Sequence, residues 1–404
     1  ERSFWVGDLD GDVYATAVWD DGSGPALFVG GEFVAAGGVT VNNIARWDGE
    51  NWLALAGPSG TGTAGAVMFG RVETLEVYDD GSGEALYVGG QFSEAGGLTV
   101  NGIAKWNGQA WSALTGPSGT GVAGFVYALE VYDDGSGEAL YAGGDFLIAG
   151  GLTLNFIASW DGSDWAGLTG PSATGVNHIV FALQAHDDGS GEALYAGGMF
   201  RSAGGLSVDH ISRWFGGQWW NLPGDDPDGW VLTLTECDDG TGTALYAGGA
   251  FIDAGGVTVN SIARWSGGGW SALSGPSGDG VSETVFALAV YDDGSGEALY
   301  AGGGFGLAGG LPADQVAKWD GSAWSALSGS SGQGVDDIVF ALAAYDDGSG
   351  EKLYVGGWFL EAGGVTAHHI ATWDGGDWSP VSDPAGTAVD YWVNALAAFD
   401  DGGG

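Results

Sequence analysis

Short apolar segments alternate along the whole chain with turns that are rich in Gly and Asp. In one copy of this pattern the segment Val126–Tyr132 is apolar except for Glu130, and Asp-Asp-Gly-Ser-Gly then leads to a second segment, Ala139–Phe146. The sequence Ile-Ala-x-Trp at 157–160 follows, and an Asp-Gly turn leads to a last segment that contains Trp165. Tight-turn sequences between short β-prone segments predict antiparallel hairpins. Each copy therefore predicts four short antiparallel strands.

The copies recur at a nearly constant interval. Asp-Asp-Gly begins at residues 20, 79, 133, 187, 238, 292, 346 and 400, and five of the seven intervals are 54 residues long. Four strands per copy without helical periodicity are typical of propeller blades, whereas a β-solenoid normally uses shorter coils. The sequence thus predicts an all-β fold, a single seven-bladed β-propeller of four-stranded antiparallel blades over residues 1–404. The predicted blades are residues 13–71, 72–125, 126–179, 180–230, 231–284, 285–338 and 339–392.

The chain contains one more predicted first strand than it has complete four-stranded copies. Eight segments match the first strand of the template, but only seven copies of the other three strands are present. Residues 393–404 are therefore a surplus closing strand. This strand either opens a further blade of a longer parent chain, or displaces or supplements the N-terminal strand. An unpaired apolar strand favours association, so we expect it to pack against another molecule or to be followed by more sequence in a longer parent chain.

Quoted in full, the segment LYAGGDFLIAGGLTLNFIASWDGSDW (140–165) shows a Gly-Gly pair at the end of one strand and aromatic residues on the two that follow. It resembles secreted bacterial propeller repeats of kelch-like pattern. It is also similar to repeats of the fungal cortical-marker family of bud-site-selection proteins. The resemblance covers the chain from about Val13 onward. It implies a propeller fold and an extracellular or cell-surface location, and it implies little about chemistry because propellers serve many functions.

The charge of the chain excludes several partners. It contains 52 acidic and 9 basic residues, with a formal net charge of -43. Such a surface repels nucleic acid and anionic membranes. Its single cysteine, Cys237, cannot form an intrachain disulfide, and no apolar segment approaches the length of a membrane span. We therefore expect no nucleic-acid partner and no membrane insertion.

Two tryptophan positions recur in every copy, represented by Trp160 and Trp165. They predict either packing between adjacent blades or a ring of carbohydrate-stacking side chains. Cys237 takes the place of a tyrosine on a first strand, so it is expected to be a packing residue. Cations share the position before the first tryptophan, which predicts local pairing with carboxylates; they are Arg46, Lys105, Arg213, Arg264 and Lys318.

Sequence motifs of known catalytic sites do not fit this pattern. Two Gly-rich segments, at 60–65 and 119–124, match the spacing of a dinucleotide-binding loop, but such a loop must precede a helix. The chain contains no G-x-S-x-G, no H-E-x-x-H and no pair of cysteines, and its five histidines do not show ligand spacing. No catalytic residue and no certain cofactor is predicted.

Acidic turns are expected to gather on one face of the propeller. Asp side chains accept hydrogen bonds from their own turns, which accounts for one Asp of each pair and less well for the second. Turn chemistry alone and assistance by Ca²⁺ therefore both remain open. Separately, the segment Asp8-Leu-Asp10-Gly-Asp12 resembles the calcium loops of integrin-type propeller repeats. Asp8, Asp10 and Asp12 are candidate metal ligands, with an ordinary turn as the alternative.

Loops on the opposite face vary among otherwise similar copies. Either ligand recognition or neutral drift of exposed loops produces such variation. The candidate binding residues there are Asn177, His178, His210, Glu283, Asp336, Asp337, His369, Asp390 and Tyr391.

These observations favour a non-enzymatic extracellular binding or scaffold domain, whose partner is another protein or a polysaccharide at the cell surface. The alternative is a secreted lectin or carbohydrate-active enzyme that uses Glu283, Asp336 and Asp337 together with Tyr391. An enzyme normally breaks the symmetry of a repeat fold at one place, where acid and base groups converge.

Overall fold

We describe the fold from a computed structural model, which covers residues 9–57, 59–64, 70–224, 226–275, 277–346, 350–381 and 392–396. The chain forms two compact units. Unit 1 comprises Glu1–Ala185, Ala193–Val208 and Ser212–Asn221, and unit 2 comprises His186–Glu192, Asp209–Ile211 and Leu222–Gly404. The boundary between the units therefore lies within the fourth repeat.

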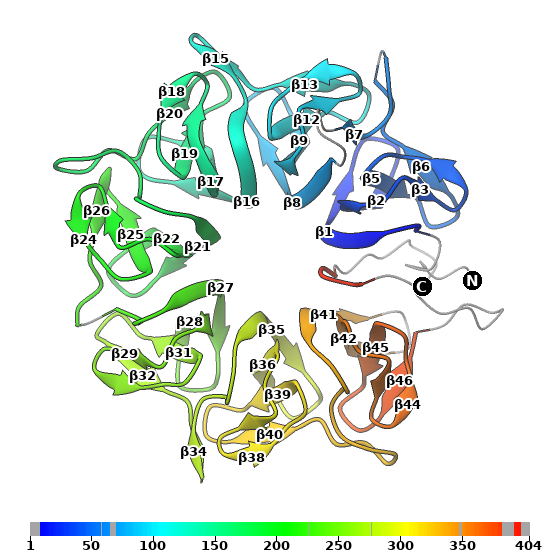
Figure 1. Cartoon of the computed structure of the whole chain (residues 1–404), viewed down its shortest axis with the longest axis vertical. Helices are drawn as coiled ribbons and strands as arrows, with labels where there is room; N and C mark the ends of the chain where they lie inside the picture. The colour runs from blue at the N-terminus through cyan, green and yellow to red at the C-terminus, as the bar shows by residue number, and fades with distance from the viewer. Residues whose placement is uncertain are drawn as a thin grey trace. The chain divides into compact units, whose positions relative to one another are not determined.

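The described residues form β-strands and turns, without a helix. In each repeat, four antiparallel strands form one sheet in the order first, second, third and fourth (Figure 1). The third sheet gains a fifth strand because β18 pairs with the long β17. The predicted all-β fold of four-stranded antiparallel sheets is confirmed, and this arrangement is consistent with propeller blades.

The bounds of these strands repeat closely. The first strands are β1 (Asp12–Asp20), β8 (Arg71–Asp79), β16 (Val122–Asp133), β21 (Val180–Asp187), β27 (Trp230–Asp238), β35 (Val285–Asp292) and β41 (Val339–Asp346). The second strands are β2 (Pro25–Glu32), β9 (Glu84–Gln91), β17 (Glu138–Ala149), β22 (Glu192–Gly198), β28 (Thr243–Ala250), β36 (Glu297–Gly303) and β42 (Glu351–Gly357). The third strands are β5 (Ile44–Trp47), β12 (Ile103–Trp106), β19 (Ile157–Trp160), β25 (Ile211–Phe215), β31 (Ile262–Trp265), β39 (Val316–Trp319) and β45 (Ile370–Trp373). The fourth strands are β6 (Trp52–Ala54), β13 (Trp111–Ala113), β20 (Trp165–Ala166), β26 (Gln218–Trp220), β32 (Trp270–Ala272), β40 (Trp324–Ala326) and β46 (Trp378–Pro380).

Short hairpins connect the second and third strands. They consist of β3 (Ala35–Ala36) with β4 (Val39–Thr40), β10 (Glu94–Ala95) with β11 (Leu98–Thr99), β23 (Ser202–Ala203) with β24 (Leu206–Ser207), β29 (Asp253–Ala254) with β30 (Val257–Thr258), β37 (Leu307–Ala308) with β38 (Leu311–Pro312), β43 (Glu361–Ala362) with β44 (Val365–Thr366), and β18 (Leu152–Thr153) against β17. Further short strands follow some fourth strands: β7 (Thr63–Ala64), β14 (Thr115–Gly116), β15 (Gly119–Thr120), β33 (Ser274–Gly275) and β34 (Gly278–Asp279).

The Gly-Gly pair that ends each second strand has two packing roles. A Cβ atom on Gly89 would lie 2.8 Å from Cγ1 of Val126, on the first strand of the next sheet. A Cβ atom on Gly90 would collide with the carbonyl oxygen of Arg71, beside the register shift that β8 shows after Val72. Glycine is therefore required where a neighbouring sheet and a β-bulge both approach the strand.

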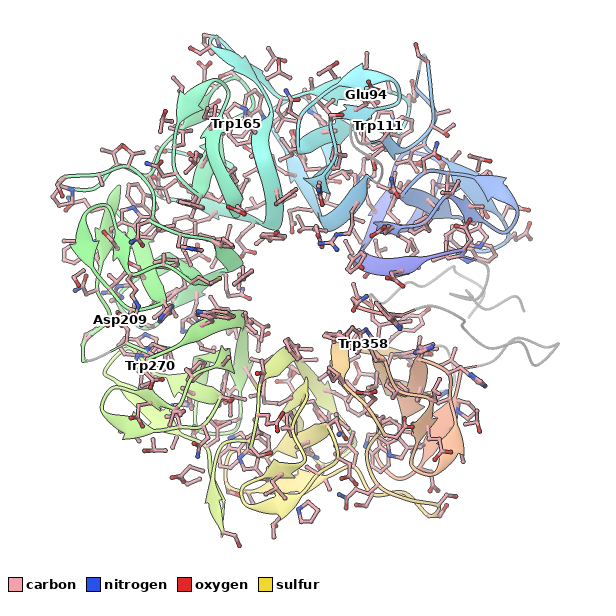
Figure 2. All side chains as sticks on the ribbon, viewed as in Figure 1. Glu94, Trp111, Trp165, Asp209, Trp270 and Trp358 are labelled. Atoms are coloured by element: carbon pink, nitrogen blue, oxygen red, sulfur yellow. The ribbon has the colours of Figure 1, made fainter. Side chains whose placement is uncertain are left out.

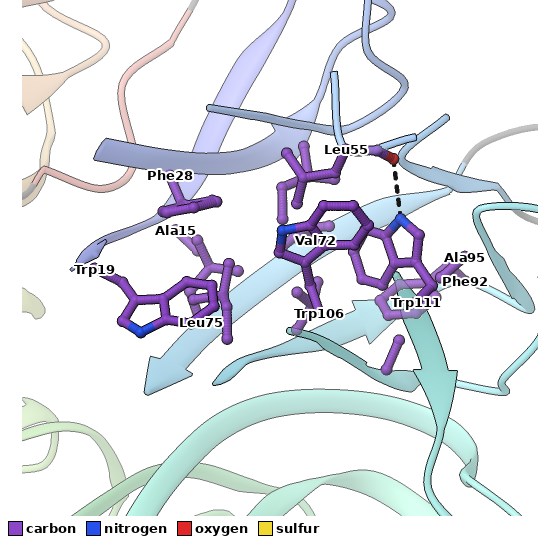
Figure 3. Packing of buried hydrophobic residues seen from close by; sticks show 14 of the residues in the cluster. Ala15, Trp19, Phe28, Leu55, Val72, Leu75, Phe92, Ala95, Trp106 and Trp111 are labelled. Carbon is purple, nitrogen blue, oxygen red and sulfur yellow. Dashed lines mark hydrogen bonds between the residues drawn. The ribbon is translucent and has the colours of Figure 1, made fainter. Parts of the chain in front are cut away.

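Both repeated tryptophans belong to the core. None of the fourteen side chains is more than 7% exposed, and the two rings of a pair lie 5.3 to 5.5 Å apart in all seven repeats. Trp111 also donates from Nε1 to the carbonyl oxygen of Leu55 in the preceding repeat at 2.9 Å (Figure 3). Figure 2 places Trp111 and Trp165 within neighbouring sheets of unit 1. The packing hypothesis is confirmed, and a ring of stacking tryptophans at these positions is wrong because the rings are covered.

Cys237 is a buried residue of β27, as predicted. Burial, followed by the charge of Asp239, raises the pKa of its thiol to about 12. The thiol is therefore protonated at neutral pH and has the low nucleophilicity of a packing residue.

The beginning of the surplus segment packs within its own chain. Val393 is buried and lies against Gly356 of β42, just as Val339 lies against Gly302 in the preceding repeat. The Trp392 ring lies against that of Trp358 at an interplanar angle of 40°, with 4.7 Å between ring centroids. Val393 therefore has a partner surface in unit 2, where we expected one in another molecule. Self-association through the surplus strand, residues 393–404, stays a prediction, and residues 397–404 lie outside the described part.

Candidate functional site

The acidic turns use their carboxylates for local structure. In the second repeat, Oδ1 of Asp79 accepts hydrogen bonds from the backbone N–H groups of Gly81 and Gly83, both at 2.9 Å. Oδ1 of Asp80 accepts from the backbone N–H of Ser82 at 3.1 Å and from its hydroxyl at 2.6 Å. The same contacts recur in other repeats, at Asp133 with Asp134, Asp187 with Asp188 and Asp292 with Asp293. Turn chemistry thus accounts for both Asp residues.

The second Asp of each turn has a further structural role. Oδ2 of Asp80 accepts hydrogen bonds from Lys105 Nζ at 2.5 Å and from the Tyr87 hydroxyl at 2.8 Å. Although burial raises the pKa of Asp80, the hydrogen bonds from Lys105, Ser82 and Tyr87 outweigh it and hold the pKa at about 2. In other turns the Oδ2 atom accepts from the indole of the next repeat, as Asp134 does from Trp214 at 3.3 Å.

Local pairing of the cations is confirmed for several of them. Arg46 Nε lies 2.9 Å from Asp21 Oδ2, and Nζ of Lys105 and Lys318 each lie 2.5 Å from the second Asp of their turns. Five of the nine cations occupy this position in the sequence. The cations therefore do not form a basic docking patch there.

The candidate metal ligands at the start of the chain serve separate purposes. Asp10 Oδ1 accepts hydrogen bonds from the backbone N–H groups of Val34 and Ala35, both at 2.7 Å. Asp12 Oδ2 accepts from the Tyr14 hydroxyl at 3.2 Å. Asp8 lies outside the described residues. In the part of the chain that the structure describes, no group of three or more His, Cys, Asp or Glu side chains could hold a metal ion.

Asn177 and Asp336 occupy the same structural position as Asp10 in their own repeats. Asn177 Oδ1 accepts hydrogen bonds from the backbone N–H groups of Arg201 and Ser202, and Asp336 Oδ1 accepts from those of Leu360 and Glu361. Asp228 makes the equivalent pair of contacts. The residue type at this position varies, but the carbonyl-like acceptor is retained. Part of the predicted recognition surface is therefore a set of loop anchors.

His210 and His369 lie at a position with fixed backbone geometry. Its φ angle is positive in all seven repeats, between 65° and 70°, for Asn43, Gly102, Phe156, His210, Ser261, Gln315 and His369. The N–H of His369 donates to the carbonyl oxygen of Phe359 at 2.8 Å, and its carbonyl accepts from the N–H of Gly357 at 3.0 Å. His210 is buried. The variable side chains thus project from one conserved, left-handed turn.

The other predicted binding residues are exposed and dispersed. His178 stacks on Phe156 in unit 1, with 6.0 Å between ring centroids. Glu283 and Asp337 are exposed in unit 2, and Asp337 Oδ1 accepts from the backbone N–H of Ile338 at 2.8 Å. Asp390 and Tyr391 lie outside the described residues.

Two grooves in unit 2 lie beside some of these loops. One, of about 360 Å³, is lined by residues that include Ser261, Asp279 and Leu307. The other, of about 250 Å³, is lined by residues that include Asp336 and Glu361. Each groove lies between consecutive repeats, so neither gathers the predicted binding residues into one site.

The first strands differ among repeats in a way that sequence analysis did not use. In unit 2, their first and third aligned positions are mainly apolar, with Trp230 and Leu232, Thr284 and Phe286, and Ile338 and Phe340. In unit 1 the first three repeats hold Asp12 and Tyr14, Arg71 and Glu73, and Phe125 and Tyr127 at these positions, and the fourth holds the apolar pair Ile179 and Phe181. Strand β8 contacts both β1 and β16 in unit 1 (Figure 1). We define the first-strand cluster as Asp12, Tyr14, Arg71, Glu73, Glu76, Tyr127 and Glu130.

Arg71 connects the two sides of this cluster. Its guanidinium lies 4.6 Å from the centroid of the Tyr14 ring and forms an ion pair with Glu73. Burial, and then the neighbouring Asp12, raise the pKa of Tyr14 to about 12. Burial also raises the pKa of Glu73, even though Arg71 lowers it. Both side chains are half-buried among charged neighbours.

Glu76 and Glu130 form the second part of the cluster, on neighbouring strands. Burial, followed by repulsion from Glu130, raises the pKa of Glu76 from 4.5 to about 7. Its Oε1 accepts a hydrogen bond from the backbone N–H of Val77 at 3.2 Å. Glu130 Oε1 accepts from the N–H of Ala185 at 2.9 Å. At neutral pH the Glu76 carboxyl is therefore present in both protonated and ionised forms.

Aromatic rings border these charges. The Tyr127 ring centroid lies 6.2 Å from that of Phe125 and 5.8 Å from that of Phe181. Burial, and then the charge of Glu73, raise the pKa of Tyr127. Half-buried donors, acceptors and ring faces therefore lie on adjoining strands of one unit. The signal that could have revealed them is the presence of Arg71, Glu73, Glu76 and Glu130 in strands that are otherwise apolar.

Comparisons with known proteins do not assign a family. No protein-family model matches the chain, and no curated protein matches it. Several solved structures do. The extracellular domain of a putative one-component system from B. thetaiotaomicron is 14% identical with a TM-score of 0.34, and the match covers 95% of this chain and 48% of that one. The extracellular domain of a putative hybrid two-component system from the same organism is 11% identical with a TM-score of 0.29, covering 90% and 46%.

An ancestral GH74 enzyme is also similar to the chain. It is 13% identical with a TM-score of 0.43, and the match covers 98% of this chain and 65% of the enzyme. The chain thus spans about half the length of the two extracellular domains and 65% of the length of the enzyme. At these scores the similarities assign neither a ligand nor a reaction. The described residues also contain no helix long and apolar enough to cross a membrane.

Proposed function

We propose that this protein is a non-enzymatic, extracellular β-propeller domain that binds its ligand at the first-strand cluster. One observation carries the proposal: polar groups occupy half-buried strand positions that most repeats of unit 2 fill with apolar side chains. Burying charged groups costs folding free energy, even when they are paired. The same strand geometry forms without these groups in β35 and β41, so folding does not require them. Ligand binding supplies a reason for their presence.

The propeller part of this proposal is supported by the repetition of one sheet along the chain. Seven sheets with the same strand order, and the contact between the Gly-Gly pair of one sheet and the Val of the next, support blades stacked side by side. Complete closure into a seven-bladed ring is part of this proposal. The extracellular location rests on the resemblance of the repeats to secreted bacterial propellers.

A double variant tests the site. Arg71→Thr with Glu73→Leu removes both members of the ion pair together, so no unpaired charge is left behind. Thr284 and Leu232 occupy the equivalent positions in other repeats, so both replacements suit this strand. We would screen wild-type protein for binding to neutral and acidic glycans, amines and cell-surface proteins, then compare the variant with Phe340→Tyr, a control in unit 2. Loss of binding in the double variant alone, with both proteins folded, supports the site. Unchanged binding in all three proteins refutes it.

A secreted carbohydrate-active enzyme is the second candidate function. The observation that favours it is the proximity of Glu76, with a pKa of about 7, to Glu130. Glycoside hydrolysis commonly uses a protonated and an ionised carboxyl group. Release of reducing ends from a polysaccharide that the protein binds, abolished by Glu76→Gln, would favour catalysis. Binding without any release of product favours the non-enzymatic proposal.

A further inference from the structure

Charge limits the ligand of the first-strand cluster. The chain has a formal net charge of -43, and the cluster itself contains four carboxyl groups and one guanidinium. Such an excess of negative charge repels anionic ligands. The ligand must therefore be neutral or cationic.

Hydrogen-bonding capacity separates these two classes. Arg71 only donates, ionised Glu73 only accepts, and the Tyr14 hydroxyl can do both. The ion pair between Arg71 and Glu73 places a donor directly beside an acceptor. An ammonium group donates but cannot accept, so it would meet the like charge of Arg71 and leave that donor unused. A pair of neighbouring ligand hydroxyl groups can accept from Arg71 and donate to Glu73 at the same time.

The aromatic border adds a second requirement. Phe125, Tyr127 and Phe181 are half-buried, and consecutive ring centroids in this order lie 6.2 and 5.8 Å apart. Small-molecule sites commonly combine aromatic lining with a few oriented polar groups. A sugar ring carries hydroxyl groups at its edge and C–H groups on its faces. It therefore matches polar and aromatic side chains that lie on adjoining strands.

We propose that the first-strand cluster binds a neutral sugar unit of an oligosaccharide or polysaccharide. Arg71, Glu73 and Glu130 hydrogen-bond to its hydroxyl groups, and Tyr127 contacts a C–H face. This inference rests on the proposed function, because it names the ligand class of the same site. Glu76 adds a carboxyl group whose protonated form donates and whose ionised form accepts, so it suits a hydroxyl group in either state.

Isothermal titration calorimetry with neutral hexasaccharides tests the proposal. The probes are cellohexaose, xylohexaose, maltohexaose, laminarihexaose and mannohexaose, and the proteins are wild type, Glu130→Gln and Tyr127→Phe. Both replacement residues already occur in this chain, because Gln184 and Phe181 occupy the equivalent positions of the fourth repeat. Phe340→Tyr, the reverse exchange in unit 2, is the matched control.

We expect wild type and Phe340→Tyr to bind at least one probe with equal affinity. Glu130→Gln should weaken that binding about tenfold, as expected for a hydrogen bond to a charged group. Tyr127→Phe keeps the ring face and should bind with nearly wild-type affinity, whereas a further variant, Tyr127→Ala, should weaken binding about tenfold through loss of the ring face. All variants are checked for folding by their thermal unfolding transitions.

The other outcomes show whether the proposed ligand class is wrong or whether the proposed site is wrong. If no hexasaccharide binds, the proposal is overturned. Binding of putrescine that is lost in Glu130→Gln, without binding of any sugar, would overturn the ligand class but retain the proposed binding function. A sugar that binds wild type, Glu130→Gln and the Arg71→Thr/Glu73→Leu variant equally would overturn both the ligand assignment at this cluster and the proposed site.

Discussion

Replacing Glu76 with Gln should change how the stability of the protein depends on pH. The pKa of Glu76 rises from 4.5 to about 7 on folding, because the carboxyl is buried and lies near Glu130. The folded state therefore binds this proton more tightly than the unfolded state does. A carboxyl group whose pKa is higher in the folded than in the unfolded state adds to the free energy of unfolding. This contribution is fully present below pH 4.5 and is lost as the pH rises through 7.

The pKa values set the size of the effect. At about 1.4 kcal/mol per pKa unit, a shift of this size corresponds to about 3 kcal/mol between pH 4 and pH 8. Gln does not ionise, and its side-chain oxygen can still accept the hydrogen bond from the N–H of Val77. We therefore expect the free energy of unfolding of Glu76→Gln, relative to wild type, to increase by about 3 kcal/mol over this range.

Urea denaturation at pH 4, 5, 6, 7 and 8 and constant ionic strength measures this difference. Taking the difference between two proteins cancels the pH dependence that comes from carboxyl groups that do not interact with Glu76. Glu130→Gln is the second comparison, because removing its charge should lower the pKa of Glu76 and reduce the wild-type pH dependence without abolishing it. Parallel stability curves for wild type and Glu76→Gln would refute the assignment of a buried, repelled carboxyl group to this position.

Other predictions concern the scaffold. Trp160→Ala should lower the free energy of unfolding by about 3–5 kcal/mol in chemical denaturation, because it removes a buried ring between sheets; a change below about 1 kcal/mol would contradict its packing role. Asp336→Asn should be close to neutral because Asn177 makes the same contacts, whereas Asp336→Ala should cost about 1 kcal/mol through two lost backbone hydrogen bonds. Both are measured by the same denaturation experiment. Millimolar CaCl₂ should raise the melting temperature no more than NaCl of matched ionic strength, because the described turns already use their carboxylates; a larger effect of Ca²⁺ would reveal a specific site.

Much of the fold was accessible from the sequence because its local signals agree. Asp-Asp-Gly-Ser-Gly specifies a tight turn, and the Gly-Gly pair marks the place where Val126 approaches Gly89 from the next sheet. Six copies of this turn sequence, a seventh in which Thr241 replaces Ser, and seven copies of the Gly-Gly pair remove the ambiguity of any single one. The boundary between the two compact units was not predicted, since it lies within the fourth repeat and has no Pro-rich or Ser-rich linker to mark it.

The candidate site was harder to predict because loop variation has two physical origins. Asn177 and Asp336 differ in charge, but both provide an oxygen that accepts from two backbone N–H groups. His210 and His369 vary at a position where the structure fixes a left-handed backbone. Neither equivalence is visible in residue types alone, because both depend on the hydrogen bonds that the backbone forms. The contact between Arg71 and Tyr14 likewise depends on two strands about 57 residues apart in the chain.

A repeat protein provides its own controls for separating scaffold from function. Where one repeat departs from another but keeps the same contact, as Asn177 does relative to Asp336, the contact belongs to the scaffold. Glu73 differs from Phe286 in charge, hydrogen-bonding capacity and partner, yet the strands that carry them have the same pairing and the same bulge. Glu73 forms an ion pair with Arg71, and the equivalent strand β35 folds in the same way without such a pair. The scaffold therefore gives no reason for placing a charged group at this half-buried position. The first-strand cluster therefore differs from the loops because its charged groups cost folding free energy without serving the scaffold, and not because its residues are exposed or variable.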